Sequence, residues 1–411
     1  MRELAVLWRD TAAAAGLTSK QKARKREPGL TIAVAALCLF AASCAPRSSW
    51  PGNIETRDGV TYVENPATGL WDGRDPLPVS FELEQVFGVE EGPDEMMLGS
   101  VRGVAVDDEQ NVYVFDQQSN RLVSFAGDGS VRWTAGRQGQ GPEEFQRARG
   151  IAWDGEGSLF IANQGGTRLD QWDLDGAFLA TYPLGTARVS GGQLAGFLRS
   201  DTAVFTEFTP GAVGVDFTVV ELGEPLTARA EASVRVNPDL AIPATVGAGV
   251  DLRVADGAIL VGNDGEYVLR GYDADAQLTR VVSRPVDYLV RVGVHFIDKR
   301  RGSIGSFGQL MAPLALESGH WLVSAYWPTN IDDPDAEIRR MMETRERTTT
   351  EYANSLDLFD PDGRFLGSVL QEGTNAPDIG RPELVGPDGR LYTTLYNPFP
   401  QVRRYRVRIE G

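Results

Sequence analysis

One pattern recurs along this chain and constrains its fold more than any other feature. Gly103–Asp107 (Gly-Val-Ala-Val-Asp) returns as Gly150–Asp154 (Gly-Ile-Ala-Trp-Asp), an offset of 47 residues. The same offset relates Asn111–Asp116 to Ser158–Asn163 without a gap. Self-similarity at a fixed period of roughly 40–50 residues is typical of propellers and solenoids. The repeat therefore limits the chain to a radial or linear stack of small units.

Four more degraded copies follow, which makes six. They begin near Thr202, Val250, Trp321 and Arg381, and an insertion at residues 328–352 divides the copy around Trp321. Each copy contains short apolar strands separated by Asp/Gly turns and has the length of a four-stranded antiparallel sheet. Such a sheet cannot bury both faces alone, whereas radial stacking buries them. The sequence predicts an all-β, six-bladed β-propeller.

The ends of the chain predict how the ring closes. The last copy stops after its third strand near Ile409, and a lone strand at Phe81–Gly88 precedes the first copy. We therefore expect this strand to be the outer strand of the last blade, with the propeller at residues 76–411. The motif resembles the NHL-repeat type of six-bladed propeller. That resemblance implies a binding platform, with some lyases, lactonases and sugar dehydrogenases among related folds.

The N-terminal segment has the pattern of an export signal. A basic stretch at Lys20–Arg26 precedes the apolar run Leu30–Ala42, which is short for a membrane-spanning helix. The run ends in Ala-Ala-Ser before Cys44 and resembles a bacterial lipobox. We expect residues 1–43 to be a lipoprotein signal peptide, Cys44 to carry the lipid, and residues 44–75 to form a tether. An ordinary cleaved signal and a transmembrane anchor are the alternatives.

Charge and cysteine content exclude several classes of partner and reaction. The chain has 40 Lys+Arg and 57 Asp+Glu, a formal charge of −17, and without residues 1–43 the charge is −21. Nucleic acids and anionic lipid surfaces would repel so acidic a body. The two cysteines, Cys38 and Cys44, lie near the N-terminus. The repeats can therefore form no internal disulfide, cysteine-ligated metal site or thiol nucleophile.

Two sets of residues occupy shared positions of the repeat and are candidates for ligand or partner binding. Asp116, Asn163 and Asn263 follow the second strand, where they would lie on one rim or satisfy turn backbone locally. Arg102, Arg149 and Arg381 precede the innermost strand. In an acidic body these arginines would make a local anion site at the channel mouth, unless each pairs with a carboxylate of the neighbouring blade.

No metal ligand or catalytic residue stands out. The only histidines are His295 and His320, so a three-histidine site is impossible. The Asp-x-Asp-Gly turns at Asp173 and Asp360 lack the distal glutamate of an EF-hand loop and indicate turns. We expect no cofactor. An enzyme acting on a lactone, sugar or peptide, with a divalent metal at the axis, is the alternative.

The insertion and the whole-chain prediction complete the sequence picture. Within residues 335–350 of the insertion, Ile338, Met341 and Met342 share one face of an expected helix, either a lid or docking element or a cover for a blade edge. We expect an exported, lipid-anchored monomer of the bacterial cell envelope. Its rim and channel mouth would bind a protein partner or small ligand. The membrane contact would be made through the lipid alone.

Overall fold

The computed structural model describes residues 50–187, 189, 191–207, 214–235, 250–263, 267–286, 293–298, 301–305, 309–333, 336–337, 340, 343–344, 351–371 and 379–410. The expected signal peptide at residues 1–43 and the expected lipid site at Cys44 lie outside this range. Both therefore stay predictions. Among the described residues, no helix is long and apolar enough to cross a membrane.

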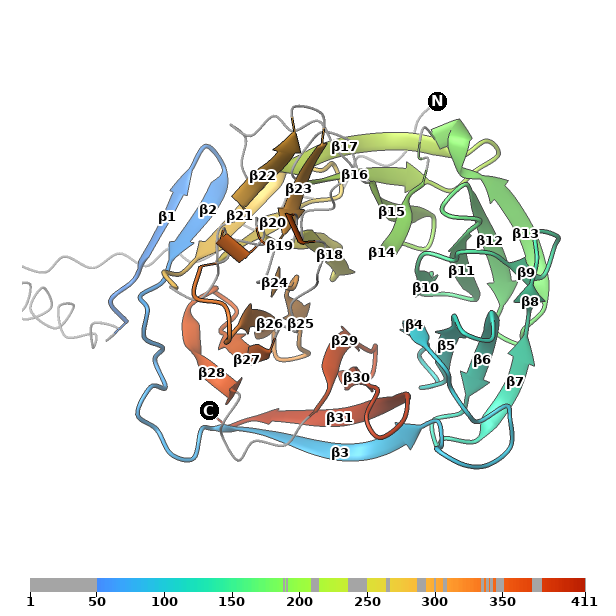
Figure 1. Ribbon diagram of the computed structural model, residues 1–411, viewed down its shortest axis with the longest axis horizontal. Coiled ribbons are helices and arrows are strands. Elements are labelled where there is room, and N and C mark those ends of the chain that lie inside the picture. Colours follow the sequence, from blue (N-terminus) through green and yellow to red (C-terminus); the bar gives the residue numbers. More distant parts are fainter. Residues whose placement is uncertain are drawn as a thin grey trace, which may run out of the picture. The chain divides into compact units, whose positions relative to one another are not determined.

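Six of the eight sheets that the described strands form are arranged radially around a central axis (Figure 1), which confirms the predicted propeller. Blade 1 consists of β4 (Val101–Val106), β5 (Val112–Asp116), β6 (Arg121–Phe125) and β7 (Val131–Ala135). Blade 2 consists of β10 (Ile151–Trp153), β11 (Ser158–Asn163), β12 (Arg168–Asp173) and β13 (Phe178–Pro183). Blade 3 consists of β14 (Gln193–Arg199), β15 (Thr202–Glu207), β16 (Gly214–Glu221) and β17 (Thr227–Arg235).

The remaining blades follow the same order, with the first strand nearest the axis. Blade 4 is built on β18 (Val250–Ala255), β19 (Ala258–Asn263), β20 (Val268–Tyr272) and β21 (Leu278–Ser283). Blade 5 has a divided inner edge and consists of β24 (Gln309–Leu310), β25 (Leu314–Ala315), β26 (Trp321–Pro328), β27 (Tyr352–Phe359) and β28 (Phe365–Gln371). Blade 6 consists of β29 (Arg381–Val385), β30 (Leu391–Leu395), β31 (Gln401–Ile409) and β3 (Val79–Phe87).

Strand β3 closes the ring as the sequence predicted. It is the outermost strand of blade 6, and its antiparallel register with β31 runs from Val79 opposite Ile409 to Phe87 opposite Val402. The two ends of the propeller are therefore held together by a ladder of main-chain hydrogen bonds. The strand from one end of the chain thus completes the blade formed by the other end, and no blade is left with a missing outer strand.

Apolar clusters hold neighbouring blades together. Between blades 1 and 2, Phe145 of the short linker strand β9 (Glu144–Phe145), which pairs with β8 (Arg137–Gln138), stacks on Trp172 with ring centroids 5.6 Å apart. Gly136 has a φ of +87°, and a Cβ there would lie 2.1 Å from the Phe145 ring, so only glycine fits. Burying one such aromatic side chain contributes about 2 kcal/mol.

The segment before β3 is part of the fold, which corrects the expected tether at residues 44–75. The hairpin of β1 (Asn53–Arg57) and β2 (Val60–Glu64) adds to blade 4, because β2 runs parallel to β21. Val63 is 1% exposed against this blade. The folded unit therefore begins at Trp50. Two five-residue strands are too short to show a periodicity, which is why the sequence suggested a linker.

The same segment continues along blade 5. The Asn65 amide donates to the Gly363 carbonyl at 3.0 Å, and its carbonyl oxygen accepts the Phe365 N–H at 2.6 Å. The Trp71 N–H then donates to the Leu366 carbonyl at 2.7 Å. Residues 50–71 therefore fasten the outer edges of blades 4 and 5 before the chain enters blade 6.

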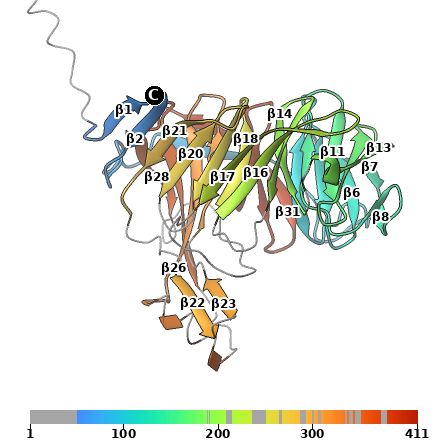
Figure 2. The same ribbon diagram turned by 90° about the horizontal axis from the view of Figure 1, so that it is seen from above.

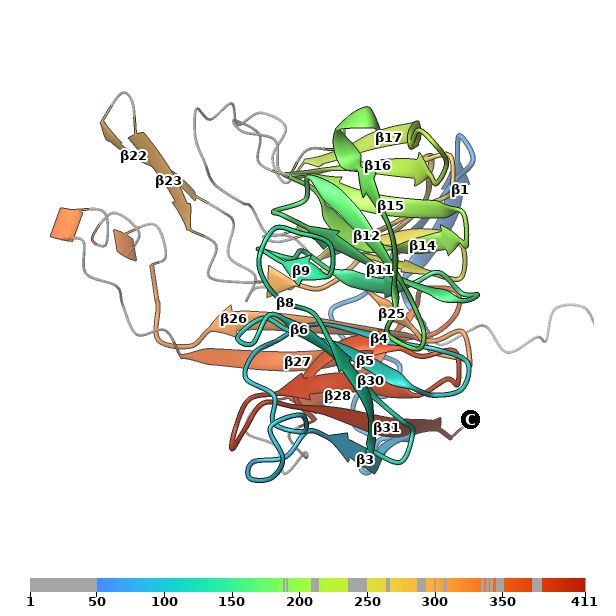
Figure 3. The ribbon, with the colours of Figure 1, turned by 90° about the vertical axis from the view of Figure 1, so that its right-hand side faces the viewer.

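Two further elements lie outside the repeat. A hairpin of β22 (Gly293–Asp298) and β23 (Arg301–Gly305), absent from the sequence prediction, occupies the connection from blade 4 to blade 5. The predicted insertion separates β26 from β27, and its residues 336–337, 340 and 343–344 are helical. Ile338, Met341 and Met342 lie outside the described residues. Figures 2 and 3 show the hairpin on the side toward which β26 and β27 extend.

Candidate functional site

One rim of the propeller collects the starts of the innermost strands, and we call it the upper rim. Antiparallel pairing places Val101, at the start of β4, opposite Asp116, at the end of β5, and Val250 opposite Asn263. Connections from second to third strands and from blade to blade therefore lie at this rim. The insertion after Pro328 leaves β26 at the same rim, as the sequence predicted.

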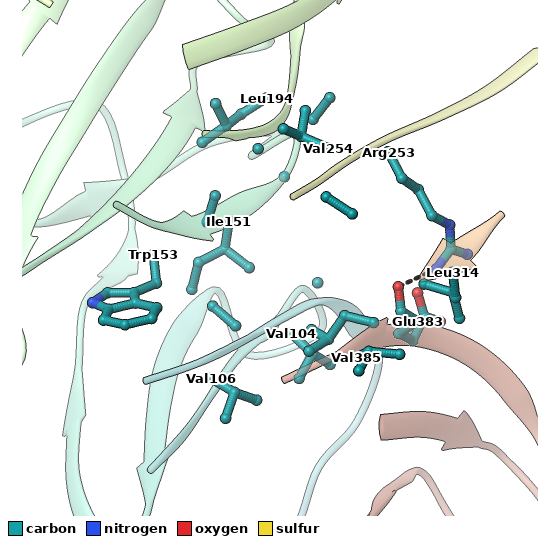
Figure 4. Close-up of a pocket in the computed structure, with 18 of the residues that line it drawn as sticks. Val104, Val106, Ile151, Trp153, Leu194, Arg253, Val254, Leu314, Glu383 and Val385 are labelled. Carbon is teal, nitrogen blue, oxygen red and sulfur yellow. Dashed lines mark hydrogen bonds between the residues drawn. The ribbon is translucent and has the colours of Figure 1, made fainter. Parts of the chain in front are cut away.

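A cavity of about 930 Å³ lies at the centre of the propeller and is lined by the innermost strands of all six blades. In Figure 4, Val104, Ile151, Val254 and Val385 surround it, and Arg253 reaches toward Glu383. The charged residues that line the cavity are Arg102, Arg149, Asp251, Arg253, Arg381 and Glu383. Four arginines and two acids make the lining basic, although the chain carries a formal charge of −17.

Arg102, Arg149 and Arg381, which the repeat placed at one position, all line this cavity, and we call them the arginine collar. The Arg149 guanidinium donates one hydrogen bond, to the Gly191 carbonyl at 2.8 Å, and the side chain is exposed. Arg381 is 56% exposed and lies 3.8 Å from Glu383 of its own strand. Within the described part of the chain, exposed Arg102 forms no hydrogen bond or ion pair. Among the described residues, none of the three arginines pairs with a carboxylate of a neighbouring blade.

Arg253 is a fourth arginine of the lining that sequence reasoning missed. Its Nη2 donates to the Pro382 carbonyl at 3.0 Å, its Nη1 donates to the Glu383 carbonyl, and its Nε lies 3.2 Å from an Asp251 carboxylate oxygen. The side chain therefore spans from blade 4 to blade 6. The strand register puts Arg253 where blade 1 has Ala105.

The divided inner edge of blade 5 makes room for this crossing. Asp251 accepts the Ala312 N–H at 2.9 Å, between β24 and β25, while it also holds Arg253. The innermost strand of blade 5 is thus reduced to two short pieces, and Arg253 bridges the gap. The sequence repeats were aligned by a fixed offset. An alignment by strand register would have put Arg253 at the position of Ala105, and an arginine at an alanine position would have marked it as a candidate.

Tyr396 contributes an aromatic ring to the upper rim beside the collar. Its hydroxyl donates to the Val101 carbonyl at 2.5 Å, and 52% of the residue is exposed. Burial of the hydroxyl end raises the pKa of Tyr396, and Glu383 adds to this effect, whereas the positive charges of Arg381 and Arg102 oppose it. The hydroxyl therefore remains a hydrogen-bond donor at neutral pH.

Asp116 lies at the expected rim, but its carboxylate is used inside the fold. Its carboxylate is 2% exposed and accepts the N–H groups of Gly99 and Ser100 at 3.2 and 2.8 Å, as well as the Ser119 hydroxyl at 2.7 Å. A carboxylate with this many internal donors is not available to a ligand. Asp116 anchors the linker that enters blade 1, which is the local turn role that the sequence left open.

Asn163, at the end of β11, has the same kind of internal role. It is fully buried, and its amide donates to the Glu144 carbonyl at 2.9 Å and to Asp170 at 2.7 Å. Its carbonyl oxygen accepts the Gln146 N–H at 2.9 Å. For Asn263 the backbone ends β19, and its side chain lies outside what the structure describes.

The Asp-x-Asp-Gly sequences are turns, as predicted. Asp173 accepts the N–H groups of Asp175 and Ala177 at 3.0 and 2.7 Å. Asp360 accepts the Arg364 N–H at 2.8 Å. Among the residues that the structure describes, no group of three or more His, Cys, Asp or Glu is placed to hold a metal ion.

Comparison with known proteins agrees with this architecture. A family described as "6-bladed beta-propeller" matches residues 89–196. The mouse "NHL repeat-containing protein 3" is 29% identical over 101 residues, and the human protein of that name is 29% identical over 73 residues. These matches cover 23% and 17% of this chain, and they span only 29% and 21% of the two relatives.

A solved structure gives the fold comparison over a longer range. The crystal structure of a member of the DUF4221 family from Bacteroides vulgatus superposes with a TM-score of 0.52 at 12% sequence identity. The superposition covers 81% of this chain and 99% of that one. At this identity the likeness supports the fold alone. The chain is a six-bladed β-propeller that is similar, over part of its length, to NHL repeat-containing proteins.

Proposed function

We propose that this protein is a binding protein of the bacterial cell envelope that uses the arginine collar to capture an anionic group. The observation that carries the proposal is the convergence of Arg102, Arg149 and Arg381 on one cavity, with most of their donors unused. Guanidinium groups form charge-assisted and often bidentate bonds with carboxylates and phosphates. Exposed arginines with few internal partners are suited to an external anion.

The charge distribution supports selective capture. An overall charge of −17 repels large polyanions, whereas the collar is a local exception inside a concave site. The anion would be a small ligand or an acidic side chain on a protein partner, since both present the same carboxylate chemistry. The rigid blades hold the collar in place, and the loops of the upper rim supply selectivity around it.

The proposal includes attachment to a membrane through lipidated Cys44. The basic Lys20–Arg26 and the apolar Leu30–Ala42 that precede it support export, and one acylated cysteine holds a protein on a membrane without spanning it. In a bacterial host, the full-length protein should incorporate a labelled fatty acid and sediment with membranes, and Cys44→Ser should lose both properties. Labelling that survives the substitution contradicts the anchor.

The collar is tested with two probes, citrate and a short poly-glutamate peptide. Each is titrated calorimetrically into wild-type protein and into the Arg102→Ala/Arg149→Ala/Arg381→Ala variant. Removing three charged donors should weaken citrate binding by about 100-fold or more, since each charge-assisted hydrogen bond contributes about 1.5–3 kcal/mol. Binding of the peptide in addition to citrate would favour a protein partner, and binding of citrate alone would favour a small ligand.

Arg199→Ala is the matched control. Arg199 ends innermost strand β14 at the opposite rim, is 62% exposed, and lies 3.8 Å from Asp201. It has the same charge as the collar residues but does not line the cavity, so its removal should leave citrate binding unchanged. Equal binding by the triple variant and the wild type, or no binding of either probe by the wild type, contradicts the proposal.

A further inference from the structure

Tyr396 is an unusual surface residue. Among the described residues, four large hydrophobic side chains are exposed: Ile54, Leu83, Leu179 and Tyr396. The first three lie on outer strands of the blades, where isolated apolar side chains are common. Tyr396 alone among these four lines the central cavity. Its exposed ring therefore faces the place where a ligand of the collar would lie.

The ring is held in one place by a contact between blades. Tyr396 follows β30 of blade 6, and its hydroxyl donates at 2.5 Å to Val101, the first residue of β4 in blade 1. A side chain fixed at its far end has little rotamer freedom left to lose when a ligand packs on it. Rigid placement of this kind lowers the entropic cost of binding.

Two collar arginines are neighbours of the residues that hold the Tyr396 ring in place. Arg102 directly follows Val101, which accepts the Tyr396 hydroxyl. Arg381 is opposite Thr394 in the β29–β30 register, two residues before Tyr396. All three side chains line the same cavity. An aromatic face is thus combined with guanidinium donors at the junction of blades 6 and 1.

Arg253 and Glu383, two other charged residues of the lining, already have internal partners. Arg253 uses its donors on Asp251 and on the carbonyls of Pro382 and Glu383. The Glu383 carboxylate accepts the Thr394 hydroxyl at 2.7 Å. Of the charged residues in the lining, those of the arginine collar therefore keep donors for a ligand, and Tyr396 adds an exposed aromatic ring.

We infer that Tyr396, Arg102 and Arg381 form a subsite for a carboxylate that is carried on a ring. The guanidinium groups bind the carboxylate, and the ring of the ligand packs on the face of Tyr396. An aromatic acid and a uronic acid share this chemistry, since a flat aromatic ring and the apolar face of a sugar ring can both cover the tyrosine. This inference rests on the proposed anion capture and adds the class of ligand.

The test compares three monocarboxylate probes by NMR titration: acetate, benzoate and glucuronate. Wild-type protein should bind at least one ring carboxylate about three- to tenfold more tightly than acetate, the range expected for one aromatic contact. Preference for benzoate identifies an aromatic ring, and preference for glucuronate identifies a sugar ring. Protons of the bound ring should also shift upfield because of the tyrosine ring current.

Two variants separate the ring from the hydroxyl. Tyr396→Leu should bind benzoate and glucuronate no more tightly than it binds acetate. Tyr396→Phe should keep the preference for the carboxylate that carries a ring. The upfield shift in the wild type reports the contact directly, so the test does not depend on the stability of either variant. Absence of both the preference and the shift in the wild type would overturn the inference, as would a preference that persists in folded Tyr396→Leu.

The outcomes also distinguish this inference from the proposed function. Binding of citrate and acetate that depends on the collar, without any preference for a ring, overturns the subsite and leaves anion capture standing. Failure of all carboxylates to bind the wild type overturns both. Ring preference that survives in the Arg102→Ala/Arg381→Ala variant shows that the ring binds elsewhere and contradicts the subsite.

Discussion

Arg253 of blade 4 donates to the main-chain carbonyl of Pro382 in blade 6 at 3.0 Å and so bridges the blade that lies between them in sequence. The Nε of the same side chain lies 3.2 Å from Asp251. This contact replaces the continuous inner strand that blade 5 lacks, because β24 and β25 contain only two residues each. The wall of the cavity is therefore completed by a side chain at this point.

Replacing Arg253 by alanine should destabilise the propeller. The change removes hydrogen bonds to two carbonyls and leaves Asp251 without its guanidinium partner, a loss of about 2–3 kcal/mol in the free energy of unfolding. Urea unfolding of Arg253→Ala against the wild type measures it. Arg199→Ala, which removes an exposed arginine, is the control. Unfolding midpoints that coincide for Arg253→Ala and the wild type would show that the bridge contributes nothing.

The closing blade predicts a dependence of stability on pH through Glu84. Burial raises the pKa of this carboxyl. A hydrogen bond from Arg390 and the positive charges of Arg390, Arg406 and Arg404 together lower the pKa by more than burial raises it, so the net shift is downward. A lowered pKa in the folded state stabilises the protein above the unfolded pKa of about 4.3. This stabilisation is lost as the pH falls through the folded pKa.

The measurement is thermal unfolding of wild type and Glu84→Gln between neutral pH and about pH 3. The variant should melt at a lower temperature than the wild type at neutral pH, because Arg406 lies 2.6 Å from a Glu84 oxygen and loses that charge partner. The two proteins should converge at acidic pH, where the glutamate is protonated. A constant difference across the pH range would contradict the assignment to Glu84.

The N-terminal hairpin should stabilise the fold instead of acting as a free tether. A chain that begins at residue 76 lacks Val63 and Trp71, which are 1% and 8% exposed, and uncovers the outer edge of β21. Burial of two such side chains is worth about 3–6 kcal/mol, so this chain should melt at a clearly lower temperature than one that begins at residue 50. Equal melting temperatures would restore the tether interpretation for residues 50–75.

Asp116 should matter for folding and not for anion capture. Asp116→Ala leaves the N–H groups of Gly99 and Ser100 without their acceptor, which should cost about 2–4 kcal/mol in the free energy of unfolding. Asp116→Asn keeps one acceptor oxygen and should cost less. Citrate affinity of the folded variants, measured by titration, should equal that of the wild type. A selective loss of affinity with unchanged stability would return Asp116 to the binding site.

The sequence predicted those parts of the structure that repeat. The six blades, the closure by β3 and the shared position of Arg102, Arg149 and Arg381 all follow from one template. The β1–β2 hairpin does not repeat and pairs with β21, some 200 residues distant, so no local pattern marks it. Long-range pairing of this kind depends on the assembled ring.

The binding site was less predictable than the fold for a related reason. A repeat position identifies which rim a residue occupies but not whether its side chain is free. Asp116 and Asn163 occupy the same repeat position, and both side chains form hydrogen bonds inside the fold. The collar arginines also share one repeat position, but their side chains are exposed. Arg253 has a role only because the inner strand of blade 5 is divided, and Tyr396 lies in a loop outside the repeat motif.

A structure of the protein crystallised with citrate tests the central claim most directly. Anion capture by the collar predicts citrate in the central cavity, with carboxylate oxygens within hydrogen-bonding distance of at least two of Arg102, Arg149 and Arg381. The outer face of blade 6 offers a competing basic surface, where Arg406 and Arg408 are 42% and 56% exposed. Citrate bound only there, or an empty cavity at saturating citrate, would contradict the account.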